Sequence, residues 1–228
     1  MTERAAREVC RRCLRPVAFC VCDLLPRLET RTRVVILQHP REARLAICSA
    51  WLCHAALPNS ELIQGVRFDD HPRVAPLLAE PGTWLLFPGP GATPATAMAG
   101  APPRALLVVD STWPQAQKLL RRNPALAALP RLAIEPGAAG ESGYVGLRRE
   151  PEAGHLATID AVAEALGALE GDPARFAPVR RAFRVAVERQ LACSRSDRRS
   201  PRHRPGAAAK LRAGSEPAPD GEEPPQVA

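Results

Sequence analysis

In this 228-residue chain, the side chains best suited to catalysis or binding belong to four consecutive residues, Asp110, Ser111, Thr112 and Trp113. They supply a carboxylate that can accept a proton, two hydroxyls that can donate hydrogen bonds, and an indole on which a planar ligand can stack. The simpler interpretation is a helix N-cap, because Ser and Thr often occupy that position only to cap. The surrounding sequence has to decide between these two interpretations.

Four of the seven cysteines lie close together near the N-terminus, with the spacing C-x2-C-x6-C-x-C. An odd number of cysteines, and no apolar segment typical of a secretory signal, argue against a disulfide framework. The spacing favours a structural zinc site, with unliganded thiols or another metal such as iron as alternatives. A zinc ion with four protein ligands has no open position, so it would stabilise the fold rather than catalyse. The predicted ligands are Cys10, Cys13, Cys20 and Cys22.

A second polar cluster begins at Tyr144 and continues through the segment Leu-Arg-Arg-Glu-Pro at 147–151 to Thr158. Its paired arginines, Arg148 and Arg149, suit a carboxylate or a phosphate, because a guanidinium binds such groups through two parallel hydrogen bonds. A solvated surface loop is the simpler alternative. His39, which precedes Pro40, is a weaker candidate, because a single histidine at a strand end is more often structural.

The elements that would position these residues alternate between strand and helix. Short apolar runs predict strands at 33–38, 61–66, 83–87, 105–109 and 131–135. Helical patterns cover 42–56, the segment from Pro114, 158–170 and the segment from Pro173, with Thr158 as an N-cap and Gly171 as a helix end. Such alternation predicts an α/β fold with a mainly parallel sheet and flanking helices. Asp110 then stands where a strand ends, the usual place for ligands in such sheets.

Composition divides the chain into three predicted parts: an N-terminal four-cysteine zinc-binding segment at 1–30, an α/β catalytic domain at 31–193, and a tail at 194–228. The tail has no aromatic residue and is first basic and then acidic, so we expect it to be disordered. The formal charge of +7 is compatible with a polyanionic partner. No apolar run is long enough to span a membrane. We therefore expect no membrane partner and a cytoplasmic location, and the sequence leaves the oligomeric state open.

Taken in order, these motifs resemble the DTW-domain family, the tRNA-uridine aminocarboxypropyltransferases. The resemblance covers about residues 8–192. It rests on the four cysteines, on Gln-His-Pro-Arg-Glu at 38–42, on Asp110 to Trp113, on Leu-Arg-Arg-Glu-Pro at 147–151 and on Ala-Thr-Ile-Asp-Ala at 157–161. The chain departs from the family pattern at Cys48-Ser49, in the longer loop at 142–147 and at Ala157. It is also similar to SPOUT-type RNA enzymes, which implies a SPOUT-like sheet with a C-terminal trefoil knot.

The resemblance implies transfer of the 3-amino-3-carboxypropyl group of S-adenosylmethionine to N3 of a tRNA uridine, with methylthioadenosine as the leaving group. The alternatives are an RNA methyltransferase that uses the same donor, and a zinc-containing RNA-binding protein without catalysis. Asp110 is the candidate general base, because uridine N3 must lose its proton to attack. The residues expected to bind the tRNA are His39, Trp113 and Tyr144. Those expected to bind the donor are Pro88, Gly89, Thr112, Arg148, Arg149, Glu150 and Thr158.

Overall fold

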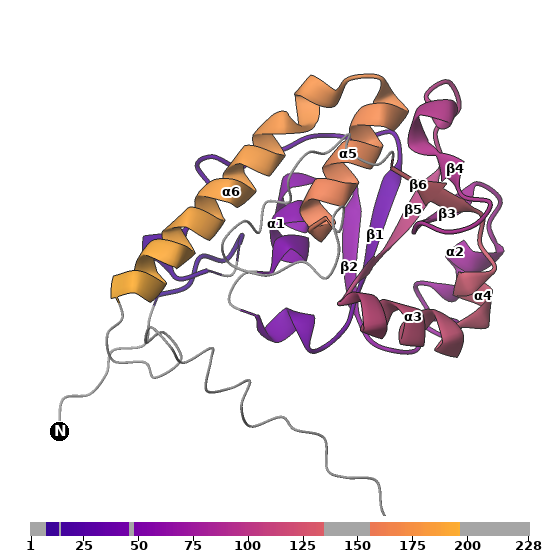
Figure 1. Cartoon of the computed structure of the whole chain (residues 1–228), viewed down its shortest axis with the longest axis horizontal. Helices are drawn as coiled ribbons and strands as arrows, with labels where there is room; N and C mark the ends of the chain where they lie inside the picture. Colours follow the sequence, from indigo (N-terminus) through magenta and orange to yellow (C-terminus); the bar gives the residue numbers. More distant parts are fainter. Residues whose placement is uncertain (1–7, 14, 46–47, 135–155, 197–228) are drawn as a thin grey trace, which may run out of the picture. The chain divides into compact units, whose positions relative to one another are not determined.

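The computed structural model describes residues 8–13, 15–45, 48–134 and 156–196. Its elements belong to one compact unit, residues 1–190, and the second unit, 191–228, contributes only the end of the last helix to the described part. A six-stranded sheet lies at the centre of the first unit (Figure 1), and all of its strand pairs are parallel. The predicted α/β fold class is therefore confirmed.

The strand order in the sheet is β2-β1-β5-β3-β6-β4. The strands are β1 (Arg33–Gln38), β2 (Ser60–Gln64), β3 (Thr83–Leu86), β4 (Thr93–Pro94), β5 (Ala105–Asp110) and β6 (Arg131–Ala133). The helices are α1 (Ser49–Ala56), α2 (Ala75–Ala79), α3 (Trp113–Arg122), α4 (Pro124–Ala127), α5 (Thr158–Glu170) and α6 (Pro173–Ser196). Short 3-10 turns occupy Val17–Phe19, Glu42–Arg44 and Ala95–Met98. None of the helices in the described ranges is long and apolar enough to cross a membrane.

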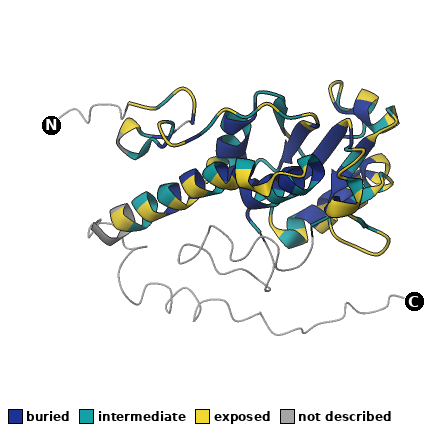
Figure 2. Ribbon diagram, turned by 90° about the horizontal axis from the view of Figure 1, so that it is seen from above, coloured by how far each residue is buried: buried dark blue, intermediate teal, exposed yellow. Residues whose placement is uncertain are grey.

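Helices cover both faces of the sheet, which explains why its central strands are continuously apolar. On one face, Val35, Leu37 and Leu107 pack with residues of α2, α3 and α4. On the other face lie α1 and α5, with α6 packed beyond them. Figure 2 shows the central strands β1, β5 and β3 mostly buried, while α6 alternates between buried and exposed residues along its length. Because side chains alternate between faces, Gln38 and Asp110 both project toward the side of α1 and α5.

Two predictions about helix starts are wrong. The helix expected at 42–56 begins only at Ser49, because Leu45 has an extended backbone and is 38% exposed instead of facing the core. Thr158 is not the N-cap of α5. Ala157 holds that position, and Thr158 is the first helical residue. Its hydroxyl donates to the Asp110 carboxylate at the end of β5 rather than to its own helix.

Candidate active site

The carboxyl ends of three neighbouring strands bring the chemically interesting residues together. Gln38 at the end of β1 is in register with Asp110 at the end of β5, and β3 ends beside them. From β1 the chain continues to β2 on one side, whereas from β5 it continues toward β6 on the other. The boundary between β1 and β5 is therefore a topological switch point, where open α/β sheets bind their ligands.

The Asp110 carboxylate is the centre of this corner. It is only 6% exposed. Gln38 Nε2 donates a hydrogen bond to its Oδ2 at 2.8 Å, and Thr158 Oγ1 donates to its Oδ1 at 2.5 Å. The N-terminal ends of α1 and α5 also lie at this corner, and a helix N-terminus favours a nearby negative charge. The Gln38 amide, the Thr158 hydroxyl and the two helix N-termini together fix the orientation of this carboxylate.

Ser111, Thr112 and Trp113 follow as the start of α3, so the simpler capping interpretation is also correct for one of them. Thr112 is the N-cap, and its backbone N–H donates to Gln115 Oε1 at 3.1 Å in a capping box. Pro114 lies in the first turn, as predicted. While Thr112 caps the helix, Asp110 faces α5 and Trp113 faces Phe87, the residue after β3. The short motif therefore serves the helix and the site together.

Trp113 packs against a neighbour that the sequence did not single out. Its ring centroid lies 5.1 Å from that of Phe87, and the Arg131 guanidinium lies 5.7 Å from the Phe87 centroid. A Cβ added at Gly89 would come within 2.6 Å of Arg131 Nη1, so glycine allows this close approach. Phe87 therefore extends the aromatic surface of Trp113 at the end of β3, and the Arg131 guanidinium lies over the Phe87 ring. Only the sheet order, which is not visible in the sequence, brings them to Trp113.

The remaining predicted residues differ in how the structure places them. His39 follows β1, and its backbone N–H donates to the Asp110 carbonyl at 2.9 Å. Its Nδ1 accepts from the Arg41 N–H at 3.2 Å within its own turn, which fits the structural alternative. Pro88 and Gly89 are exposed just after β3. Four predicted residues lie outside the described residues: Tyr144, Arg148, Arg149 and Glu150.

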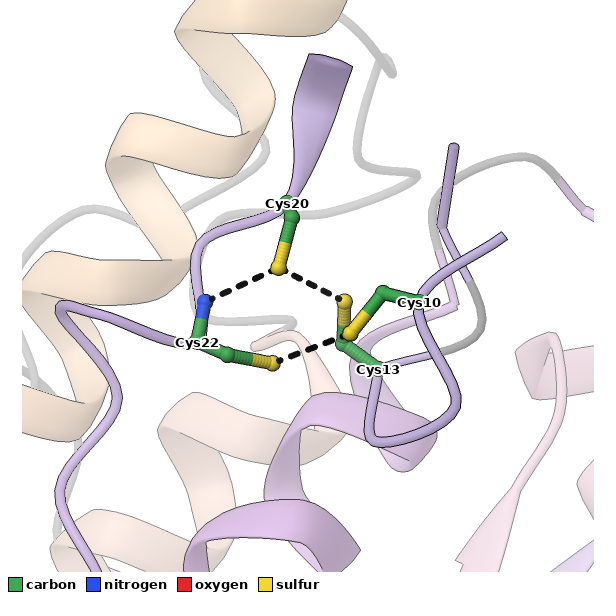
Figure 3. Close-up of side chains that lie close together, drawn as sticks. All are labelled: Cys10, Cys13, Cys20 and Cys22. Atoms are coloured by element: carbon green, nitrogen blue, oxygen red, sulfur yellow. Dashed lines mark hydrogen bonds between the residues drawn. The ribbon is translucent and has the colours of Figure 1, made fainter. Parts of the chain in front are cut away.

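The four predicted zinc ligands form one cluster, away from Asp110 in the sequence. All four sulfur atoms lie within 4.8 Å of one another. In Figure 3 the side chains converge, with Cys10 to Cys22 and Cys13 to Cys20 sulfur distances of 3.7 Å. Four thiolates at about 2.3 Å from a tetrahedral zinc stand about 3.8 Å apart, so the cluster has the dimensions of such a site. Backbone hydrogen bonds from Cys13 and Arg12 lower the pKa of Cys10 to about 6, whereas burial raises the pKa of Cys20 and of Cys22, so a bound metal would have to displace their protons.

Arginines join this cysteine cluster to the helices of the α/β domain. The Arg12 guanidinium donates to the carbonyl oxygens of Leu25 at 3.2 Å and Ala55 at 3.2 Å, the latter in α1. Arg189 of α6 donates to the Cys20 carbonyl. The cluster therefore braces α1 against α6. This arrangement fits a structural role and does not reach the Asp110 corner.

Comparison with known proteins identifies the family of this chain. The DTW domain matches residues 7–191. The chain belongs to the DTW-domain family. A protein from Drosophila melanogaster named tRNA-uridine aminocarboxypropyltransferase 2 is 34% identical over 175 residues, which cover 73% of this chain and 68% of the relative. An Arabidopsis thaliana protein named tRNA-uridine aminocarboxypropyltransferase A is 31% identical over 195 residues, with 73% and 74% covered. No solved structure is a significant match.

In this DTW domain, two further cysteines have different environments. Both Cys48 and Cys53 fall within the helical pattern at 42–56, which favours small core residues at these positions. Cys53 is 1% exposed and fits that expectation, whereas Cys48 is the half-buried N-cap of α1. Gln38 Nε2 lies 3.0 Å from Cys48 Sγ. Burial, and after it the charge of Asp110, raises the pKa of Cys48 to about 11. Cys48 is therefore a member of the Asp110 corner that the helical pattern had hidden.

The effect of the Asp110 charge on the pKa of Cys48 predicts how Cys48 reacts with iodoacetamide. Because its pKa is about 11, labelling of Cys48 should be slow at neutral pH and should rise as pH approaches that value. Replacing Asp110 with Asn removes a negative charge, so the pKa should fall and labelling at pH 8 should become faster. Peptide mass spectrometry measures this, with Cys53 in the same digest as an unreactive internal control. Equal labelling of Cys48 in the two proteins would contradict this effect.

Proposed function

We propose that this protein transfers the 3-amino-3-carboxypropyl group of S-adenosylmethionine to N3 of a uridine in tRNA and releases methylthioadenosine. The observation that carries the proposal is a fixed carboxylate at the switch point of a domain whose family relatives bear the name tRNA-uridine aminocarboxypropyltransferase. Those names favour the transfer over the alternatives of methylation and of RNA binding alone.

In the proposed reaction, uridine N3 loses its proton and attacks the terminal carbon of the aminocarboxypropyl chain. The carbon–sulfur bond breaks and its electron pair returns to sulfur, so the positively charged sulfonium becomes the neutral thioether of methylthioadenosine. Asp110 accepts the N3 proton. The hydrogen bonds from Gln38 and Thr158 hold the Asp110 carboxylate in one orientation. Orientation of the two substrates supplies much of the remaining acceleration.

We assign the other residues from their contacts where the structure describes them, and from the family resemblance where it does not. Trp113, supported by Phe87, offers a stacking face for the target base. Pro88, Gly89 and Thr112 border the donor near the strand ends, and Thr158 acts through its hydrogen bond to Asp110. His39 and Tyr144 contact the tRNA. Arg148 or Arg149 binds the donor carboxylate or a tRNA phosphate. Glu150 orders these arginines or accepts a hydrogen bond from the donor's amino group. The family resemblance supports these assignments. The SPOUT-like knotted path and the location in the cytoplasm remain parts of the proposal. So does the disordered tail, although its predicted start at 194 is too early, because α6 continues to Ser196.

The exposed side of α3 is the proposed approach path of the tRNA. This helix starts at Trp113 and carries Lys118, Arg121 and Arg122 on its exposed surface, with no acidic residue in the helix. Within the described ranges, none of these three side chains forms an ion pair. Uncompensated basic groups beside a stacking residue suit a nucleic-acid backbone near its target base.

The Asp110→Asn variant tests the proposed base. At saturating donor and tRNA, release of methylthioadenosine should fall by roughly 10²- to 10⁴-fold, because proton removal by a positioned group contributes that much. The residual rate should rise with pH, because hydroxide can then remove the N3 proton. Chromatography of methylthioadenosine gives the rates, and Ser111→Ala, which loses only a hydroxyl bonded to a neighbouring carbonyl, should stay near the wild-type rate. A full rate for Asp110→Asn would overturn the assignment.

Metal analysis tests the proposed zinc site. Untagged protein should contain one zinc ion per chain, and Cys13→Ser should lose most of it, because a buried ligand is removed. The melting temperature should fall in that variant and in wild-type protein treated with a chelator. Cys48→Ser serves as the control and should keep its zinc. Unchanged zinc content in Cys13→Ser, or iron in place of zinc, would contradict the assignment.

Salt dependence of tRNA binding tests the α3 surface. Replacing Arg121 and Arg122 with Gln should weaken binding and lower the slope of log affinity against log salt by about one for each lost phosphate contact. Filter binding over a salt series measures both quantities. Arg181→Gln with Arg184→Gln is the matched control, because these exposed arginines lie on α6 at the other side of the sheet. The proposal fails if the two double variants change the slope equally.

A further inference from the structure

Gln38, the last residue of β1, has a feature that the proposed base alone does not explain. Its side chain is 0% exposed. Both hydrogens of its amide nitrogen have acceptors, one at Asp110 Oδ2 at 2.8 Å and one at Cys48 Sγ at 3.0 Å. The reverse orientation of the amide would place its oxygen against the carboxylate, so these contacts fix which end is the nitrogen. The remaining polar atom of this side chain is its carbonyl oxygen, Oε1.

Gln38 Oε1 is buried and accepts no hydrogen bond within the part of the chain that the structure describes. Bulk solvent does not reach this atom. An unpaired buried acceptor is costly, and each such atom in a folded protein calls for an explanation. This one lies in the same amide group that holds Asp110, at the switch point of the sheet. A ligand that binds at this corner and brings an N–H group would supply the missing donor.

The chemistry of the two substrates narrows the choice of that N–H group, an argument that rests on the proposed function. The uridine N3–H is lost during the reaction and cannot satisfy Oε1 throughout. The adenine amino group stands at the far side of the sulfonium from the reacting carbon. The α-ammonium of the donor lies only two carbons from that carbon, carries three N–H groups, and has a positive charge that suits the neighbouring Asp110 carboxylate.

We propose that Gln38 Oε1 accepts a hydrogen bond from the α-ammonium group of S-adenosylmethionine. Gln38 then has two functions through one amide: its nitrogen orients Asp110, and its oxygen positions the chain that is transferred. The neutral carbonyl and the adjacent carboxylate together select a protonated amine. The site therefore recognises the amino group of the donor, and not only its carboxylate and its nucleoside.

Equilibrium binding by calorimetry tests this recognition without turnover. Wild-type protein is titrated with S-adenosylmethionine and with the analogue that lacks the α-amino group. The natural donor should bind at least about tenfold more tightly, because a hydrogen bond to a charged group is worth that factor. Equal affinities would overturn the inference. Absence of any binding of S-adenosylmethionine would instead overturn the proposed function itself, so the two failures are distinguishable.

Substitution at Gln38 assigns the preference to this residue. Gln38→Met removes the carbonyl at similar size, and the affinity ratio between the two ligands should approach one. Thr158→Val is the matched control: it also removes one hydrogen bond to Asp110 but leaves Oε1 in place, so it should keep the preference. If Gln38→Met does not fold, Gln38→Asn withdraws the carbonyl by one methylene and should give the same loss. A preserved ratio in the folded Gln38 variant would overturn the inference.

Discussion

The hydrogen bonds that hold the Asp110 carboxylate are the interaction on which the rest of the site depends. They connect the end of β5 to the end of β1 through Gln38 and to the start of α5 through Thr158. A carboxylate this deeply buried requires donors, because a charge without partners is costly in a protein interior. The sheet register, the position of α5 and the start of α1 must all be correct for these donors to meet it. The short motif after β5 therefore acquires its chemistry from segments that are far away in the sequence.

Much of this arrangement was predictable because it is local. The apolar run before Asp110 indicated a buried strand, Pro114 and Thr112 indicated the start of α3, and the spacing of the four cysteines predicted their convergence. Each of these signals lies within a few residues of the feature it predicts. The strand alternation likewise gave the α/β fold class.

Most of the omissions, and the error at Thr158, have a common physical cause, which is tertiary arrangement. Thr158 was predicted as an N-cap, since local sequence shows the hydroxyl but not the carboxylate that it binds across the fold. Gln38 and Cys48 were not recognised as partners of Asp110, and Phe87 and Arg131 were not recognised beside Trp113. These pairings depend on β1, β5, β3 and β6 lying side by side and on where α1 and α5 begin, which a single sequence does not specify.

The most direct test of the central claim follows the fate of the donor's atoms. Purified protein is incubated with tRNA and with S-adenosylmethionine that carries an isotope label either in the aminocarboxypropyl chain or in the methyl group. Mass spectrometry of the digested nucleosides then shows which label reaches uridine. The account predicts a modified uridine that carries the aminocarboxypropyl label, with the methyl label recovered in methylthioadenosine. Methyl label on the nucleoside, or an unmodified tRNA, would contradict it.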